Sequence, residues 1–333
     1  MKIYIENSSW LNIGDFFYQE SIFNIFKEIF TAEQFKIKCF DAPIKRSFKI
    51  NNKFFLKNAF ELRNYLDGDI YVLSGPILGE EFINSYGKFI ETIKSNGKEY
   101  LILSAHGKDI SENKKFLEKY PPLAISTRSF ETYKIYNSFS KNSFDGICNA
   151  FFLPIYLDVP NFIYPKYILK SFYSTFEPKV KLNLINQKID LENISLSLKK
   201  KFLWKISRHF NFLTKNEDQL EGFNVIRPIH DLSYKFHHLN FAKKNSYISY
   251  NISNYLSVYK SSDLVISDRI HSVVIGLSLN IPSVLCGNWD RATLLDRLKL
   301  KKINNCYLPP EKKQINNELE NYKNWLRSII KLS

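Results

Sequence analysis

The chain has 333 residues and a net charge of +14, with 44% hydrophobic and 24% charged residues. Its length fits two domains or one large α/β unit, and its composition excludes collagen, a coiled coil and a wholly disordered chain. The longest uncharged apolar stretch, Val273–Cys286, contains Gly276 and Pro282 and is shorter than the roughly 18 residues that span a membrane. No transmembrane helix is therefore expected.

The cysteines and histidines indicate neither disulfides nor a metal site. The four cysteines show no CxxC spacing, lie in or beside apolar runs and are predicted to be reduced core residues: Cys39, Cys148, Cys286 and Cys306. The six histidines form neither an HExxH motif nor a cluster at zinc spacing, so no metal is expected. Met1–Glu6 does not resemble a signal peptide, which predicts a cytoplasmic protein; peripheral contact with the inner face of the membrane is the alternative.

Lysine and arginine together number 47 against 33 acidic residues, and this excess predicts attraction to anions. The candidates are a phosphorylated small molecule, an anionic membrane surface and a nucleic acid. The basic residues occur in short groups such as Lys199–Lys201, and each group by itself is typical of a solvated surface. Because no helix-turn-helix, zinc-finger or RNA-recognition signature is present, a nucleic-acid partner is not expected.

Strand-like and helix-like segments alternate through the first half of the chain. Apolar runs of strand length predict strands at Ile3–Ile5, Asp69–Gly75, Glu99–Gly107, Leu123–Thr127 and Gly146–Leu153. Apolar residues at about helical spacing predict a helix beginning at Phe16, and a second helix is predicted over Arg128–Tyr136. This alternation predicts a doubly wound parallel domain over residues 1–158.

A stretch with three prolines, Pro154, Pro160 and Pro165, interrupts the pattern, and the domain boundary is placed there. The alternation then resumes, which predicts a second Rossmann-like domain over residues 159–312. Its strands are predicted at Tyr167–Leu169, Phe223–Arg227, Asp263–Ser267 and Ser283–Cys286, and its helices at Ser195–Phe212, Ile248–Tyr259 and from His271. Residues 313–333 have one apolar face and predict an amphipathic helix that packs back on the protein, with membrane contact as the alternative.

The segment Ser262–Val284 indicates a strand, a short polar turn, a helix and a second strand. Arg269 and His271 fall where the strand's carboxyl end meets the helix N-terminus, the edge at which open α/β sheets bind ligands. A helix N-terminus favours an anion, an arginine adds bidentate recognition of carboxylate or phosphate, and a histidine can transfer a proton near neutral pH. The alternative is that His271 caps the helix and Arg269 pairs with Asp268.

These residues carry a resemblance to a known family. The run Ser267–Val284 resembles the R-[IL]-H-[AS] signature of the polysaccharide pyruvyl transferase family. Other segments agree in order: Asn12–Asp15 resembles its N-x-G-D loop, Arg128–Thr132 its R-x-x-x-[ST] region, and Asp145–Phe152 the stretch that closes its first domain. The resemblance therefore covers most of the chain.

What the resemblance implies is an α/β fold with two Rossmann-like domains facing a cleft, as in GT-B glycosyltransferases. Phosphoenolpyruvate would bind between the domains as co-substrate, with no further cofactor, and pyruvate would become a ketal on a sugar of a polysaccharide or glycolipid precursor. The saccharide acceptor would be lipid-linked or nucleotide-linked. In place of the glycine-rich turns of many relatives the chain has Ser74–Gly79 and Ser104–Gly107, which leaves acceptor recognition open.

Ketal formation defines the groups that the donor side must supply. The methylene carbon of phosphoenolpyruvate needs an acid, its two anionic groups need cations, and the sugar hydroxyl needs a base. His271 is predicted to be the acid and Arg269 the clamp on carboxylate or phosphate, with Ser272 beside them. Arg227 and His230 follow another strand and are predicted to join this donor site; for His230, a loop position bonded to the neighbouring aspartate is an equally good interpretation.

Four residues of the first domain are predicted to bind the acceptor: Asn12, Asp15, His106 and Arg128. Asp15 either binds sugar hydroxyls or caps the helix that follows it. His106 ends an apolar strand at the same rim, where a satisfied loop histidine is the alternative. Arg128 begins a helix, which is a poor place for a cation, so binding of an anion or pairing across the cleft is favoured.

Two other functions are weighed against pyruvyl transfer. A GT-B-type glycosyltransferase with a nucleotide-sugar donor would place its diphosphate at the same helix N-terminus, and the fold alone does not separate the two activities. A non-enzymatic binder of nucleic acid or anionic membrane would depend on the net charge alone. The order of the motifs favours a transferase of the polysaccharide pyruvyl transferase type.

Overall fold

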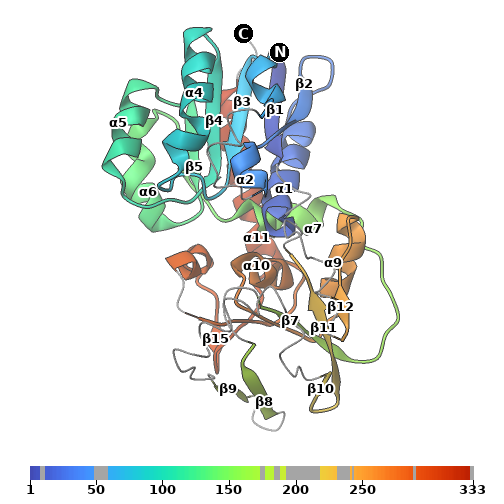
Figure 1. The fold of residues 1–333 in the computed structure, drawn as a ribbon. Helices are drawn as coiled ribbons and strands as arrows, with labels where there is room; N and C mark the ends of the chain where they lie inside the picture. Colours follow the sequence, from blue (N-terminus) through green and yellow to red (C-terminus); the bar gives the residue numbers. More distant parts are fainter. Residues whose placement is uncertain are drawn as a thin grey trace. The chain divides into compact units, whose positions relative to one another are not determined.

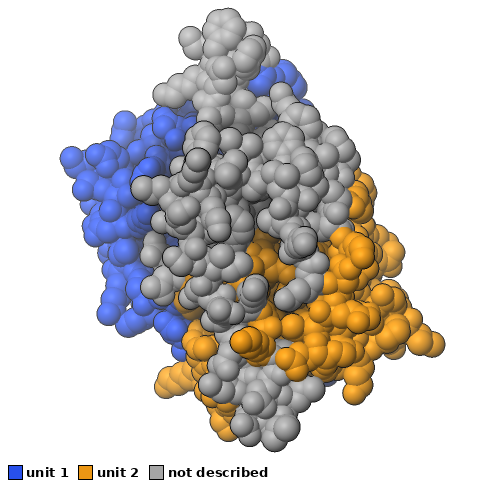
Figure 2. All heavy atoms as spheres, turned by 60° about the horizontal axis from the view of Figure 1, so that its bottom comes forward, with its two compact units in different colours: residues 1–156, 293–298, 311–333 blue, residues 157–292, 299–310 orange. Residues whose placement is uncertain are grey.

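The computed structural model describes residues 1–7, 12–48, 59–172, 177–183, 188–192, 218–230, 241, 244–287 and 290–330. The chain divides into two compact units (Figure 2, blue and orange). Unit 1 comprises Met1–Tyr156, Thr293–Leu298 and Glu311–Ser333, and unit 2 comprises Leu157–Ala292 and Lys299–Pro310. The last helix of the chain is therefore part of unit 1.

Unit 1 is built on a parallel sheet of six strands in the order β2-β1-β3-β4-β5-β6 (Figure 1). Its strands are β1 (Lys2–Asn7), β2 (Lys36–Asp41), β3 (Ile70–Ser74), β4 (Glu99–Ala105), β5 (Ala124–Thr127) and β6 (Ser143–Asp145). The strand order reverses between β1 and β3. The topological switch point of the sheet, where doubly wound folds bind their ligands, therefore lies between these two strands.

Helices cover both faces of this sheet. They are α1 (Ile13–Ile29), α2 (Ile44–Phe48), α4 (Phe82–Ser95), α5 (Ser111–Lys119), α6 (Phe130–Tyr136), α7 (Leu153–Tyr156) and α11 (Lys312–Ile329), with 3-10 turns η1 (Leu62–Tyr65), η2 (Asn137–Phe139) and η3 (Asn149–Phe152). On β5, Ile125 belongs to the same core cluster as Phe82 of α4, whereas the next residue, Ser126, contacts Tyr322 of α11. Since successive side chains of a strand point to opposite faces, α4 and α11 cover opposite faces of the sheet.

The C-terminal helix α11 packs on unit 1 along one face. Its buried residues are Ile315, Leu319, Tyr322, Lys323 and Leu326. The ring of Tyr322 lies 5.5 Å from that of Phe144, and the buried ammonium group of Lys323 lies 2.7 Å from a carboxylate oxygen of Glu28 on α1. Among the described residues, no helix combines the length and the apolar character that crossing a bilayer requires.

Unit 2 contains an eight-stranded sheet in the order β10-β11-β7-β13-β14-β16-β15, with β12 paired to β11. Its strands are β7 (Tyr167–Ser171), β10 (Gln219–Leu220), β11 (Phe223–Pro228), β12 (Ser246–Tyr247), β13 (Leu264–Ser267), β14 (Ser283–Leu285), β15 (Lys302–Ile303) and β16 (Cys306–Tyr307), and a separate hairpin joins β8 (Lys179–Asn183) to β9 (Lys188–Glu192). Strands β11, β7, β13 and β14 are parallel, and their order reverses between β7 and β13. Unit 2 therefore repeats the Rossmann-like arrangement of unit 1 and has its own switch point.

Two helices of unit 2 flank the strands that form this switch point. Helix α9 (Ile252–Lys260) precedes β13, and helix α10 (Ile270–Ser278) follows it and packs against β13 and β14. The 3-10 segment η6 (Asp290–Leu298) comes after β14. The predicted helix over Ser195–Phe212 lies outside the described residues.

The predicted alternation of strands and helices is confirmed for most elements, but several bounds differ and one predicted strand is wrong. Arg128 does not begin a helix, because α6 starts at Phe130. Helix α1 begins at Ile13 rather than Phe16, so Asp15 lies inside its first turn. The predicted strand Gly146–Leu153 is instead η3 and the start of α7, and the last strand of the sheet is β6. A short run that is buried on all sides has no periodicity by which a strand can be told from a helix.

Cys39 corrects the prediction that all four cysteines are core residues. It is exposed, whereas Cys148, Cys286 and Cys306 are buried, and all four are free thiols. Cys39 belongs to β2, which forms the edge of the sheet and buries only Phe40. An edge strand covered on one side leaves most of its residues in contact with solvent, even where the sequence looks apolar.

The close approach of Gly107 to Leu78 generates a stability prediction. We expect Gly107→Ala to lower the free energy of unfolding by about 1–3 kcal/mol, the usual cost of overpacking. A Cβ atom at Gly107 would lie 2.4 Å from the carbonyl oxygen of Leu78, which is held in a bridge between the two backbones. Gly79→Ala is the control, because a Cβ atom there meets nothing within 4 Å. Urea denaturation of both variants measures the difference, and equal losses would contradict the packing argument.

Candidate functional site

The candidate donor site begins where strand β13 passes into helix α10. Arg269 is the N-cap of α10 in extended conformation, and its carbonyl accepts the N–H groups of Ser272 and Val273. His271 is buried inside the first turn of α10, so it does not cap the helix. The predicted strand-turn-helix geometry is therefore present, and it places Arg269 at the switch point of unit 2.

Hydroxyl groups join the carboxyl ends of three neighbouring strands beneath this turn. Ser171 Oγ donates to the carbonyl of Pro228 at 3.1 Å, and Ser267 Oγ donates to the carbonyl of Ser171 at 2.6 Å. The N–H of Arg269 in turn donates to Ser267 Oγ at 2.9 Å. The backbone that carries Arg269 is thus fixed to the ends of β7, β11 and β13.

Two of the predicted donor residues are joined to each other through a tyrosine. Nε2 of His230, two residues beyond β11, lies 2.6 Å from the hydroxyl of Tyr259 on α9, and that hydroxyl lies 2.8 Å from Oγ of Ser272. His230, Tyr259 and Ser272 are all buried. The ring of Tyr255 meets the His230 ring edge-on at 5.4 Å. The structure thus connects His230 and Ser272 inside unit 2.

The positive charge of Arg269 affects the pKa values of His230 and Tyr259. Burial and, next, the positive charge of Arg269 hold the pKa of His230 well below its usual value of 6.5. Burial raises the pKa of Tyr259, while Arg269 acts in the opposite direction. His230 is therefore neutral at pH 7 and adds no positive charge to that of Arg269.

The structure places Arg227 in a buried ion pair. Its guanidinium donates to both carboxylate oxygens of Glu177, at 2.9 and 3.1 Å, and to the carbonyl of Lys244 at 3.3 Å. The ammonium group of Lys170, which is fully buried on β7, lies 3.3 Å from the same carboxylate. Glu177 is thus shared by two cations, one of which was predicted to bind the donor. The sequence signal for this cluster is Lys170, a lysine within the otherwise apolar run of β7.

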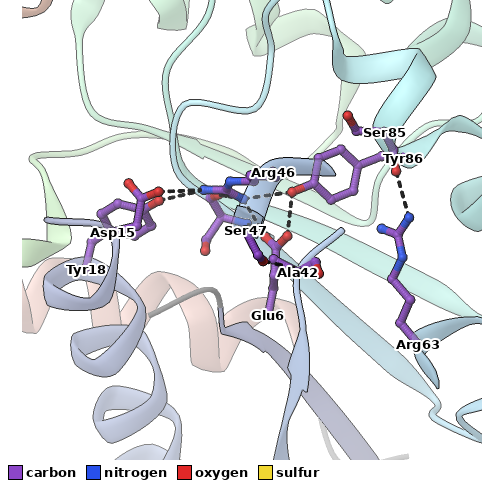
Figure 3. A network of polar contacts seen from close by, with 10 residues as sticks. Glu6, Asp15, Tyr18, Ala42, Arg46, Ser47, Arg63, Ser85 and Tyr86 are labelled. Atoms are coloured by element: carbon purple, nitrogen blue, oxygen red, sulfur yellow. Dashed lines mark hydrogen bonds and ion pairs between the residues drawn. The ribbon is translucent and has the colours of Figure 1, made fainter. Parts of the chain in front are cut away.

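The candidate acceptor site in unit 1 is centred on Arg46 of α2, which the sequence analysis did not single out. Figure 3 shows its guanidinium between Asp15 and Tyr18 on one side and Glu6 and Tyr86 on the other. It donates to Glu6 at 3.0 Å, Tyr86 at 2.8 Å and Tyr18 at 2.7 Å, and forms an ion pair with Asp15 at 3.8 Å. Asp15 is thus part of a charged network at the switch point between β1 and β3.

Arg128 is connected to the same network through Tyr18. It is fully buried, and its guanidinium carbon lies 5.4 Å from the centroid of the Tyr18 ring. Burial raises the pKa of Tyr18 well above 10, with opposing effects of Arg46 and Arg128 on one hand and Asp15 and Glu6 on the other. Two guanidinium groups and two carboxylates therefore surround one phenol, and their formal charges balance.

Asn12 and His106 lie at the same edge of the unit 1 sheet. Asn12 is the N-cap of α1, and its carbonyl, not its side chain, accepts the N–H groups of Asp15 and Phe16. His106 follows β4, and its Nδ1 lies 3.4 Å from the hydroxyl oxygens of both Ser129 and Thr132 at the start of α6. The four predicted acceptor residues all follow carboxyl ends of strands. Of these four residues, Asp15 and Arg128 are connected to each other through Arg46 and Tyr18.

The two Rossmann-like units define a GT-B-like fold, and solved structures of similar fold include the following two. S. aureus MnaA in a co-structure with UDP has a TM-score of 0.53 and 9% identity, covering 98% of this chain and 90% of that one. A putative UDP-N-acetylglucosamine 2-epimerase from Listeria monocytogenes has a TM-score of 0.51 and 8% identity, covering 98% and 87%. At such low identity these likenesses show the fold alone.

The sequence model of the polysaccharide pyruvyl transferase family matches residues 12–291. The chain therefore belongs to the polysaccharide pyruvyl transferase family and is a transferase. No curated protein matches the chain. In the part of the chain that the structure describes, no group of three or more His, Cys, Asp or Glu side chains is placed to hold a metal ion.

The low pKa of His230 predicts a loss of stability in acid. Below about pH 6.5 the unfolded chain binds a proton at this histidine that the folded protein does not, so the free energy of unfolding falls as the pH falls. One such proton contributes a slope of about 1.4 kcal/mol per pH unit. We expect His230→Gln to reduce the slope measured by urea denaturation between pH 7.5 and 5.5. An identical slope in both proteins would show that His230 is not held neutral.

The ion pair of Arg227 predicts a structural defect when it is broken. Arg227→Met should lower the free energy of unfolding by about 3 kcal/mol, the low end of the cost of breaking a buried pair, because Lys170 still contacts Glu177. Lys244→Met is the control in the same unit, since its pair with Asp218 is solvent-exposed and worth less than about 1 kcal/mol. Thermal and urea unfolding measure the stability of both variants. Equal losses in the free energy of unfolding would show that the pair of Arg227 with Glu177 stabilises the fold no more than an exposed pair does.

Proposed function

We propose that this transferase moves pyruvate from phosphoenolpyruvate to hydroxyl groups of a sugar in a polysaccharide or glycolipid precursor, forming a ketal. The family match supports pyruvyl transfer. The observation that carries the donor assignment is the position of Arg269 at the N-terminus of α10, beside a histidine that burial keeps neutral. That position adds a positive charge at a helix N-terminus, which by itself favours an anion.

The donor has two anionic groups, and Arg269 supplies a planar fork that suits either of them. His271, in the first turn of the same helix, is our candidate for the acid. Its proton goes to the methylene carbon, which becomes a methyl group and leaves positive character at the carbon that bears phosphate and carboxylate. A sugar oxygen attacks that carbon as a base takes the proton of its hydroxyl, which restores the proton that His271 gave up. The oxygen of the second hydroxyl then bonds to the same carbon, and inorganic phosphate leaves with the proton of that hydroxyl, which completes the ketal.

The acceptor is assigned to unit 1 on the basis of charge. The network around Tyr18 contains two carboxylates and two guanidinium groups, so it has no excess charge to attract a phosphate. Glu6 and Arg128 are fully buried, whereas Asp15 and His106 are partly exposed and can form hydrogen bonds with hydroxyl groups. We therefore propose Asn12, Asp15, His106 and Arg128 as acceptor-side residues, with a saccharide, lipid-linked or nucleotide-linked, as the acceptor.

A nucleotide-sugar glycosyltransferase is the second candidate. It is favoured by the likeness of the fold to S. aureus MnaA, whose co-structure contains UDP. Such a donor would also place its phosphates at a helix N-terminus in unit 2. The family match stands against it, and a direct comparison of donors separates the two.

The test is calorimetric titration of the wild type with phosphoenolpyruvate and with a panel of UDP- and GDP-sugars. We expect saturable binding of phosphoenolpyruvate and a loss of about 10-fold or more in Arg269→Ala, because a charge-assisted hydrogen bond is worth about 1.5–3 kcal/mol. Binding of a nucleotide sugar without phosphoenolpyruvate would assign the chain to the second candidate.

His271→Asn separates binding from chemistry in the same experiment. It should retain binding of phosphoenolpyruvate while turnover, followed as phosphate release with a saccharide acceptor, falls by about 10²–10⁴-fold, the usual contribution of a general acid. Unchanged turnover in His271→Asn would remove this histidine from the mechanism even where the donor is correct.

A further inference from the structure

The hydroxyl of Tyr259 connects three elements that meet at the donor side of unit 2. It comes from the last turn of α9 and contacts His230 after β11 and Ser272 in the first turn of α10, at 2.6 and 2.8 Å. Both partners are buried, so water does not compete for these hydrogen bonds. Neither the sequence motifs nor the family match assigns a role to this tyrosine.

Two arrangements of the protons make Tyr259 the donor in one of these two hydrogen bonds and the acceptor in the other. A phenol and a serine hydroxyl each donate one proton, and a neutral imidazole has one N–H. Either Ser272 donates to Tyr259 and Tyr259 donates to Nε2 of His230, or Nε2 of His230 carries the proton and both donations run the other way. Within these two arrangements, the tautomer of His230 is coupled to the direction of the hydrogen bond between Tyr259 and Ser272.

This coupling bears on the place where the donor would bind. The N–H of Ser272 donates to the carbonyl of Arg269 at 3.1 Å, so the two residues share the first turn of α10. The positive charge of Arg269 also lowers the pKa values of Tyr259, Tyr255 and His230, against or in line with the effect of burial. A shift of Ser272 would therefore shift Arg269, the cap residue of the helix.

We propose that Tyr259 is a positioning residue: by holding Ser272 and His230 it fixes the first turn of α10, and with it Arg269, in the orientation that binds the donor. Tyr259 acts through these residues and does not touch the donor. The proposal rests on the proposed function, because it assigns the anionic donor to this helix end.

The first test is Tyr259→Phe, which keeps the ring among its aromatic neighbours and removes only the hydroxyl. We expect the Kd for phosphoenolpyruvate to rise about tenfold, the effect of losing about one buried hydrogen bond in the bound geometry. Tyr167→Phe is the matched control. Its hydroxyl is also buried and donates to the carbonyl of Val258 on the same helix at 2.7 Å, but it lies outside the His230–Tyr259–Ser272 group.

Comparable melting temperatures for Tyr259→Phe and Tyr167→Phe, with weaker donor binding in Tyr259→Phe alone, would support positioning. Equal donor affinities in the two variants would overturn it. Ser272→Ala completes a double-mutant cycle: if the two side chains act as one unit, the double variant binds the donor no more weakly than either single variant. Independent, additive losses would also overturn the proposal.

A spectroscopic measurement distinguishes failure of this proposal from failure of the proposed function. The ring nitrogens of His230, assigned by comparison with His230→Gln, should change their ¹⁵N shifts in Ser272→Ala, because the serine hydroxyl sets the direction of the Tyr259 hydrogen bond. If the wild type binds a nucleotide sugar instead of phosphoenolpyruvate, the same variants are titrated with that donor. If the wild type binds neither phosphoenolpyruvate nor a nucleotide sugar, the proposed function fails. The role of Tyr259 in positioning a donor site then fails as well, whatever ¹⁵N shifts are measured.

Discussion

Glu6 is fully buried at the end of β1, where its carboxylate accepts hydrogen bonds from Arg46, from the hydroxyl of Tyr86 and from the N–H of Ser74. A carboxylate so far from water is stable only with all these partners. The requirement fixes α2, which carries Arg46, to the strand ends. It also brings Asp15 to the switch point, since the same guanidinium pairs with both acids.

Unit 2 also pairs a buried carboxylate with cations, but it uses different residues. The net charge near the strand ends therefore differs between the two units. Glu177 is enclosed by Arg227 and Lys170, so these cations serve the framework. Arg269 stands at the helix end beside a histidine without charge. In unit 1, carboxylates and guanidinium groups balance around Tyr18. The contrast between a helix end that favours anions and a balanced polar network is the basis on which we propose a phosphorylated donor for unit 2 and a hydroxyl-rich acceptor for unit 1.

The sequence was sufficient for features that depend on local pattern. A buried strand, a polar turn and a helix over 262–284 were predictable because hydrophobic period and turn residues change together there, and Arg269 lies where that pattern placed it. Pairings between distant residues were not predictable. The partner of Arg227 is 50 positions away in the chain. Tyr259 resembles the other buried aromatic residues in the sequence, because its partner His230 is 29 positions away. The strand predicted at Gly146–Leu153 failed because complete burial removes the periodicity on which the prediction depends.

The order in which the chain is made has a consequence for unit 1. Its sheet is complete by Asp145, yet the face that Ser126 belongs to is covered by α11, which begins only at Lys312. During synthesis from the N-terminus, all of unit 2 leaves the ribosome before this face can be closed. The nascent protein therefore carries an uncovered face while the residues between Asp145 and Lys312 are synthesised, a period in which a chaperone is most useful to it.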